Sequence, residues 1–122
     1  KVDDEATIIL QYPKTQVIIQ ASWNWPVSRK DVEVYGVTGQ IIADNGSTIR
    51  YQLGDNAQEQ KLTDLKKESP NDDPFTLLAA VVRGQITPQD ADLSALQNNM
   101  VVMEILDAAM QSAKSGKVVK LK

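Results

Sequence analysis

The chain has 122 residues, of which 42% are hydrophobic, 24% charged and 5% aromatic, and this length and composition fit one compact domain. Its net charge of −3 argues against nucleic acid as a partner, because phosphate backbones attract basic surfaces. With no histidine and no cysteine, the chain cannot form a disulfide, a thiolate nucleophile, a Ser-His-Asp relay or a His- or Cys-ligated zinc site.

The sequence also predicts how the chain relates to membranes. No run approaches the roughly 18 consecutive apolar residues of a membrane span, so we expect no membrane partner. The residues from Lys1 to Glu5 are mostly acidic, whereas a signal peptide begins basic and continues apolar; the compartment stays open. Because Lys1 is not a methionine and a strand-like run follows within a few residues, we expect a piece of a longer protein.

Apolar and polar residues alternate through the first half of the chain, a pattern typical of half-buried strands. Strands are expected over 6–12, 16–23, 32–37, 40–44 and 47–53, with short candidate edge strands at 61–65 and 117–121. Pro13 lies in the first turn, and Asn45-Gly46 suits a two-residue hairpin because both positions of a type I′ turn require a positive φ. The pattern predicts an antiparallel meander of about five strands.

Two helices are expected in the second half. The first begins at Pro74 with Asp73 as its N-cap, since aspartate accepts from free first-turn amides and proline suits the first helical position. The second begins at Ser94, with Gln97 completing a capping box, and ends before Gly116. Strands followed by helices predict an α+β fold, with an open, mainly antiparallel sheet and helices packed on one face.

Hydrophobic residues interrupt the polar outer face of the expected sheet. The candidate interface residues are Ile9, Ile18, Gln20, Tyr35 and Ile42. Scattered surface hydrophobes are ordinary, whereas a contiguous apolar patch usually marks a partner surface. Neutral glutamine can donate and accept hydrogen bonds across an interface without burying a charge. We favour a homo-oligomer formed through the open sheet face, with isolated surface hydrophobes as the alternative.

The segment Trp23-Asn24-Trp25-Pro26, followed by Arg29 and Lys30, is the most unusual cluster. Aromatic walls beside cations are a common way to hold a polyol or a cofactor ring. The candidate substrate-binding residues are therefore Trp23, Trp25, Arg29 and Lys30. The alternative is structural, with Trp23 completing the core and Trp25 packing under the loop, and the residues alone leave both open.

Other kinds of site have no sequence signal in this chain. Its six glycines spell neither G-x-G-x-x-G nor a P-loop, so no phosphate cradle is predicted. The acidic pairs at 3–4, 72–73 and 90/92 lack the spaced oxygen ligands of a cation site. A general base needs a partner that tunes it, and none is visible. We therefore nominate no catalytic, cofactor-binding or metal-binding residue.

The order of several motifs resembles a known family. They are the segment at Trp23, Glu33 to Gly39 (EVYGVTG), Asp72-Asp73-Pro74-Phe75, and Leu93 to Ala109 (LSALQNNMVVMEILDAA). Their order is similar to that in the C-terminal half of the Gfo/Idh/MocA oxidoreductases, relatives of glucose–fructose oxidoreductase and inositol dehydrogenase, and the resemblance covers nearly the whole chain. The resemblance implies an α+β domain that holds a sugar or polyol and often oligomerises through its sheet, after an N-terminal Rossmann domain that binds NAD or NADP.

The chain departs from that family in its coverage. The family's glycine-rich dinucleotide fingerprint, its Glu-Lys-Pro segment with the catalytic lysine, and its Asp/His pair have no counterpart here, so no catalytic residue is carried over. Some relatives place two tyrosines at a comparable strand exit, facing the substrate, which correspond to Trp23 and Trp25.

The resemblance implies that residues 1–122 are a single, partial C-terminal domain for substrate binding and oligomerisation. Its parent would be an NAD(P)-dependent sugar or polyol dehydrogenase, with the Rossmann domain outside this chain, which would not be catalytic alone. The alternative, from a different class, is a free-standing, non-enzymatic α+β module that dimerises through its sheet.

Overall fold

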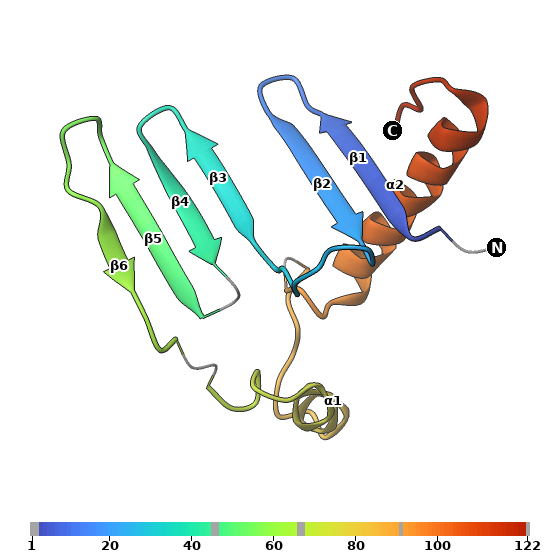
Figure 1. The fold of residues 1–122 in the computed structure, drawn as a ribbon. Coiled ribbons are helices and arrows are strands. Elements are labelled where there is room, and N and C mark those ends of the chain that lie inside the picture. The colour runs from blue at the N-terminus through green and yellow to red at the C-terminus, as the bar shows by residue number, and fades with distance from the viewer. Residues whose placement is uncertain (1–2, 45–46, 66–67, 91, 122) are drawn as a thin grey trace. The chain divides into compact units, whose positions relative to one another are not determined.

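The computed structural model describes residues 3–44, 47–65, 68–90 and 92–121 (Figure 1). The chain divides into two compact units, here called the strand unit (Lys1–Asp72) and the helical unit (Asp73–Lys122). The strands are β1 (Glu5–Gln11), β2 (Gln16–Ser22), β3 (Val32–Gly36), β4 (Gly39–Asp44), β5 (Thr48–Leu53) and β6 (Gln60–Leu62), and the helices are α1 (Pro74–Val82) and α2 (Leu96–Ser115). The α+β class with open antiparallel sheets is confirmed.

Strands β1 and β2 form an antiparallel hairpin. Their register runs from the pair Glu5 and Ser22 to the pair Gln11 and Gln16. The predicted turn is confirmed, since the Tyr12 amide donates to the Thr15 carbonyl oxygen at 2.8 Å. Because strand side chains alternate between faces, one face carries Glu5, Thr7, Ile9 and Gln11 with Ser22, Gln20, Ile18 and Gln16, and the other carries Ala6, Ile8 and Leu10 with Ala21, Ile19 and Val17.

The remaining strands form a four-stranded antiparallel sheet in the order β3-β4-β5-β6. The expectation of one continuous meander is wrong, because no strand ladder joins β2 to β3 within the described ranges. The loop 23–31 separates the two sheets, and its Pro26 has no amide to donate to a ladder. The sixth strand covers Gln60–Leu62 rather than 61–65, and Asp64 has a positive φ of 58°, which is incompatible with an extended strand.

The four-stranded sheet has one polar and one apolar face. On the polar face Arg50 donates from Nε to Asp44 at 2.9 Å and from Nη1 to Glu59 at 3.1 Å. The hydrogen bond and charge of Asp44 raise the pKa of the Arg50 guanidinium. The Tyr35 hydroxyl donates to Glu33 at 2.8 Å. The opposite face carries Val32, Val34, Ile41, Ala43, Ile49, Tyr51 and Leu53.

Helix α1 begins as predicted. Asp73 is its N-cap, and Asp73 Oδ2 accepts from the Thr76 amide and from the Thr76 hydroxyl, both at 2.7 Å. Pro74 occupies the first helical turn, where its missing amide has no intrahelical partner to lose. The helix ends at Val82, and Gly84 follows with a φ of 70°. The sequence signals at both ends of α1 are therefore confirmed.

Helix α2 begins one residue later than the capping-box prediction requires. Its N-cap is Ala95, which makes no side-chain cap hydrogen bond, so the prediction of Ser94 as the N-cap is wrong. A turn closed by the Ala95 amide on the Asp92 carbonyl oxygen precedes the helix, and Asn99 Nδ2 donates to the Ala95 carbonyl oxygen at 2.9 Å. The helix ends at Gly116, which has a φ of 66°.

The predicted strand at 117–121 does not form among the described residues. The Lys117 amide donates to the Ser115 hydroxyl at 3.3 Å, which places the start of this segment in a turn that closes α2. No helix in the described ranges is both long and apolar enough to cross a membrane.

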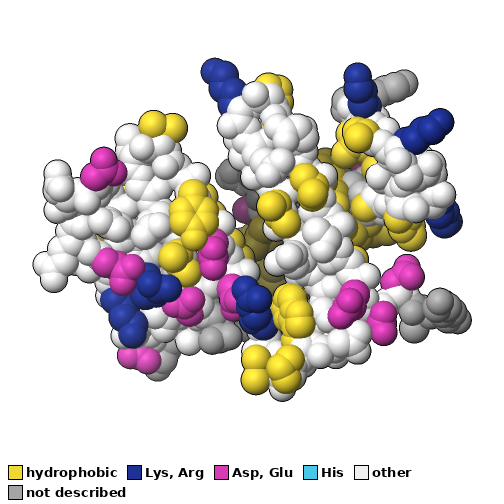
Figure 2. Space-filling view, turned by 45° about the horizontal axis from the view of Figure 1, so that its top comes forward, with side chains coloured by type: hydrophobic (Ala, Val, Ile, Leu, Met, Phe, Trp, Pro, Cys, Tyr) yellow, Lys and Arg dark blue, Asp and Glu magenta, His cyan; other side chains and the backbone are white. Residues whose placement is uncertain are grey.

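Buried side chains are few in the described part of the chain, and they are small: Ala80, Ala95 and Ala108. Many large hydrophobic side chains are exposed instead, and Figure 2 shows some of them at the surface beside charged groups. Strand pairing and helical hydrogen bonds, rather than a filled core, define the elements of each unit.

Candidate functional site

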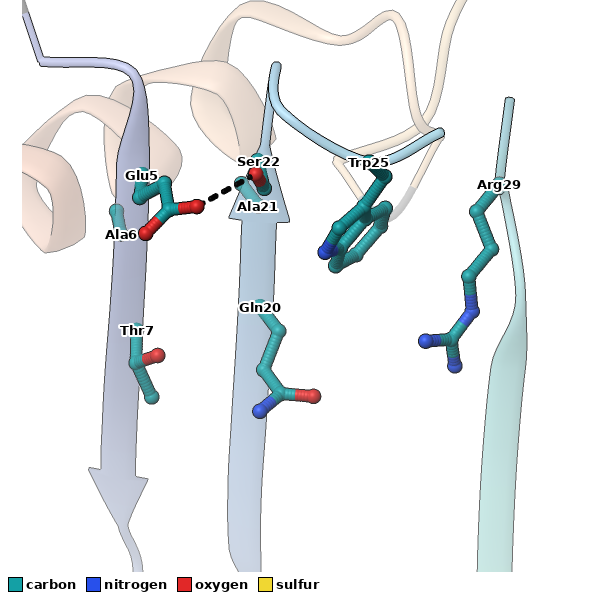
Figure 3. A pocket seen from close by; sticks show the side chains of 8 residues that line it. All are labelled: Glu5, Ala6, Thr7, Gln20, Ala21, Ser22, Trp25 and Arg29. Carbon is teal, nitrogen blue, oxygen red and sulfur yellow. Dashed lines mark hydrogen bonds between the residues drawn. The ribbon is translucent and has the colours of Figure 1, made fainter. Parts of the chain in front are cut away.

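A polar pocket of about 430 Å³ lies at the end of the hairpin where β1 begins and β2 ends (Figure 3). Its volume is within the range of roughly 300–1,000 Å³ that is usual for small-molecule sites. The hairpin register places Glu5 opposite Ser22 and Thr7 opposite Gln20. The lining residues are Glu5, Ala6, Thr7, Gln20, Ala21, Ser22, Trp25 and Arg29.

The Glu5 carboxylate is held in place by neutral donors. Its Oε1 atom accepts from the Ser22 hydroxyl at 3.1 Å and from Asn24 Nδ2 at 3.4 Å. The Ser22 hydroxyl also accepts from the Asn24 amide at 3.0 Å. The Trp23 amide donates to the Asp4 carbonyl oxygen at 2.9 Å, which fixes the exit of β2 against the entry of β1. The carboxylate therefore has a fixed position at one wall of the pocket.

Trp25 and Arg29 form the opposite wall. The Arg29 guanidinium carbon lies 5.1 Å from the centre of the Trp25 ring, a cation–π arrangement. Arg29 also donates from Nε to the Asp31 carboxylate. Figure 3 shows the Trp25 indole between β2 and Arg29. The Asp31 carboxylate balances the charge of Arg29, so this wall is aromatic and polar but only weakly cationic.

The structure brings together two of the four predicted substrate-binding residues, Trp25 and Arg29. Trp23 is 88% exposed and does not line this pocket, and Lys30 is also exposed outside it. The end of β2 explains the difference. The strand ends at Ser22, and Trp23 lies in a bend beyond it, so the path of the chain after the strand brings Trp25, but not Trp23, to the pocket.

Sequence reasoning did not identify Glu5, Thr7 and Ser22 as lining residues. A usable signal existed, since a turn centred on Pro13 and Lys14 fixes the register of the whole hairpin and pairs Glu5 with Ser22. Gln20, which the sequence placed in an oligomer interface, lines this pocket.

The remaining interface candidates lie in two groups. In the hairpin, Ile9 pairs with Ile18 on the face of Gln20, and they are 61% and 58% exposed. In the four-stranded sheet, the register places Tyr35 and Ile42 on one shared face, where Tyr35 is exposed and Ile42 half-buried. Each pair shares a face within its own sheet, and because the strands form two sheets rather than one, a single contiguous patch of all four side chains stays a prediction.

The pocket offers hydrogen bonds and an aromatic surface. It combines one carboxylate, one side-chain amide, two hydroxyls, a guanidinium and an indole. Among the described residues there is no group of three or more carboxylates that could hold a metal ion. The lining set contains donors and acceptors suited to hydroxyl groups, so the arrangement is suited to binding a small polar molecule.

Comparison of the sequence with protein families and curated proteins, and of the structure with solved structures, gives no match.

Proposed function

We propose that the chain is the substrate-binding and oligomerisation portion of an NAD(P)-dependent sugar or polyol dehydrogenase, and that it is not catalytic alone. The observation that carries the proposal is the pocket in which Glu5 faces Trp25 and Arg29, within a chain whose motif order resembles the substrate half of the Gfo/Idh/MocA oxidoreductases. Sugars and polyols present both hydroxyls for the polar wall and C–H faces for the indole.

Hydride transfer requires a nicotinamide ring held against the carbinol carbon of the substrate. The sequence of this chain contains no G-x-G-x-x-G segment, the motif with which a Rossmann domain holds the pyrophosphate. NAD or NADP is therefore bound by another part of the parent protein in this proposal. The role of the present chain is to bind and orient the substrate.

The face of the hairpin supports the oligomerisation part of the proposal. The exposed pair of Ile9 and Ile18 lies between the neutral pairs Thr7–Gln20 and Gln11–Gln16. Gln16 Nε2 donates to Gln11 Oε1 at 3.0 Å, so polar groups at this edge are already paired. An apolar centre with neutral neighbours matches the low charge of interface cores, and a second copy of the chain is the proposed partner.

The test uses the natural full-length protein with NAD⁺ or NADP⁺ and a panel of sugars and polyols. We expect formation of reduced cofactor with at least one of them, and a G-x-G-x-x-G βαβ unit encoded upstream of Lys1. A reading frame without such a unit, together with no cofactor reduction, would contradict the proposal.

The second candidate is a free-standing α+β module that dimerises and performs no chemistry. The exposed pair of Ile9 and Ile18 supports this dimerising module as strongly as it supports the dehydrogenase proposal. The two candidates differ in ligand binding, since only the dehydrogenase portion needs a sugar or polyol in the pocket at Trp25.

A further inference from the structure

We infer that this pocket selects neutral polyhydroxylated ligands over anionic sugars, and that Glu5 is the residue that makes the selection. The inference rests on the proposed function, because it names the ligand class of the same pocket. It follows from three properties of the lining residues: how their charges are compensated, where free acceptors remain, and how large the space is.

The charges of the pocket are compensated unequally. Arg29 is the one cation in the lining set, and it is paired with Asp31 and stacked on Trp25. Glu5 is the one carboxylate in that set, and its hydrogen bonds come from neutral donors, Ser22 and Asn24. Because Asp31 balances the charge of Arg29, Glu5 leaves the described lining with a net negative charge, so the carboxylate of an anionic sugar is disfavoured.

The available acceptors suit hydroxyl groups. Glu5 Oε1 accepts the hydrogen bonds from Ser22 and Asn24, and within the described residues Oε2 has no hydrogen-bond partner. Next to Glu5 on the same face, Thr7 and Gln20 form the following cross-strand pair and add a hydroxyl and an amide. Figure 3 shows these side chains and Trp25 around the pocket. A carboxylate oxygen accepts charge-assisted hydrogen bonds, which are stronger than neutral ones.

The space is large enough to admit a sugar ring. The pocket of about 430 Å³ lies near the lower end of the range of small-molecule sites. The half-buried Trp25 indole gives an apolar surface for the C–H groups of the ring. A sugar ring has hydroxyls on its edge and C–H groups on its face. Its hydroxyls suit the Glu5 side of the pocket, and its C–H groups suit the Trp25 side.

The experiment measures binding by calorimetry in the natural full-length protein, with and without NAD⁺, using myo-inositol, glucose and glucuronate. We expect the tighter of the two neutral ligands to bind about tenfold more tightly than glucuronate, the scale of one hydrogen bond to a charged group. Glu5→Gln should weaken neutral binding by about tenfold and remove most of the discrimination against glucuronate.

The matched control is Asp55→Asn, which makes the same charge change at an exposed residue that does not line the pocket, and it should leave all three affinities unchanged. Thr7→Val removes a lining hydroxyl without changing a charge, and it is the substitute test variant if Glu5→Gln fails to fold. Equal binding of glucuronate and glucose, or no sugar binding by the unmodified protein, would overturn the inference whatever the variants do.

The outcome for this inference is separable from that for the proposed function. If the protein reduces the cofactor but Glu5→Gln leaves its affinity for sugars unchanged, the inference is refuted and the dehydrogenase proposal stands. Glu5-dependent binding of neutral sugars without cofactor reduction would support the inference and refute the dehydrogenase proposal.

Discussion

At the level of single residues, the position of Trp25 depends on where β2 ends. Ser22 is the last residue of the strand and Asn24 bonds back to its hydroxyl. The chain therefore leaves the alternating pattern between Trp23 and Trp25, and the two indoles, two positions apart in sequence, occupy different environments. Trp25 stacks with Arg29 while Trp23 is exposed.

This difference leads to a kinetic prediction. In the proposed full-length dehydrogenase, Trp25→Ala should raise the KM for the sugar or polyol by about tenfold with little change in kcat, because it removes binding that ground state and transition state share. Steady-state kinetics at saturating cofactor measures both constants. Trp23→Ala is the matched control and should leave KM unchanged; an unaltered KM in Trp25→Ala would reject a role for this pocket in substrate binding.

Asp73 gives a pH-dependent prediction. The hydrogen bonds from the Thr76 hydroxyl and the Thr76 amide lower the pKa of the Asp73 carboxyl below its ordinary value of 3.8. A lowered pKa in the folded state means that the cap stabilises α1 above pH 3.8 and that this contribution is lost as the pH falls through the folded-state pKa. An NMR titration that follows the Thr76 amide should report this transition.

The control for this titration is Asp73→Asn, which keeps a capping oxygen but has no proton to gain. The acid transition at the Thr76 amide should disappear in this variant while α1 persists at neutral pH. An Asp73 carboxyl that titrates above 3.8 in the folded protein would contradict the capping geometry.

At the level of elements, close contact between β4 and β5 depends on a glycine. Gly39 pairs with Leu53 at the end of the ladder, and a Cβ atom added to Gly39 would collide with the Gln52 carbonyl oxygen and lie 3.1 Å from two atoms of Leu53. The Gln52 oxygen belongs to the backbone, so relief requires a shift of the strand rather than a change of rotamer.

Gly39→Ala should therefore destabilise the strand unit by about 1–3 kcal/mol, the usual scale for overpacking. Chemical denaturation followed by circular dichroism measures the free energy of unfolding. Gly36→Ala is the control, because its nearest contact would be the Gly39 carbonyl oxygen at 3.4 Å, and it should cost clearly less. Equal stability of both variants would show that β4 and β5 can separate without cost.

At the level of the whole molecule, the proposed self-association would use the hairpin face. Ile9 and Ile18 form an exposed cross-strand pair among neutral side chains. Exposed apolar pairs of this kind are disfavoured in water unless a partner covers them. The proposed partner is the same face of a second copy, which would bring identical apolar pairs together.

Ile18→Lys should reduce the oligomeric state in sedimentation equilibrium, because two lysine side chains of like charge would replace the apolar contact at the centre of the interface. Gln58→Lys adds the same charge at an exposed position outside the hairpin and should leave the oligomer intact. An unchanged oligomeric state in Ile18→Lys would defeat the proposal of self-association through this face.

Short-range signals in the sequence were sufficient for most elements. Alternation identified β1 to β5, Pro13 lay in a turn as expected, and Asp73-Pro74 and Gly116 marked helix ends. The prediction at Asn45-Gly46 lies outside the described residues. The start of α2 was predicted wrongly because two local arrangements compete there. Ser94 could cap the helix, but the turn from Asp92 to Ala95 starts the helix one residue later.

The sequence by itself determined the α+β class, the hairpin register and the absence of thiol and imidazole chemistry, because these follow from alternation, turn residues and composition. Only the tertiary structure decided that the strands form two sheets and that Glu5 faces Trp25. The reason is physical: strand pairing is fixed by neighbouring residues, whereas the path of the loop after Ser22 depends on a hydrogen bond from Asn24 to Glu5, 19 positions away in the chain.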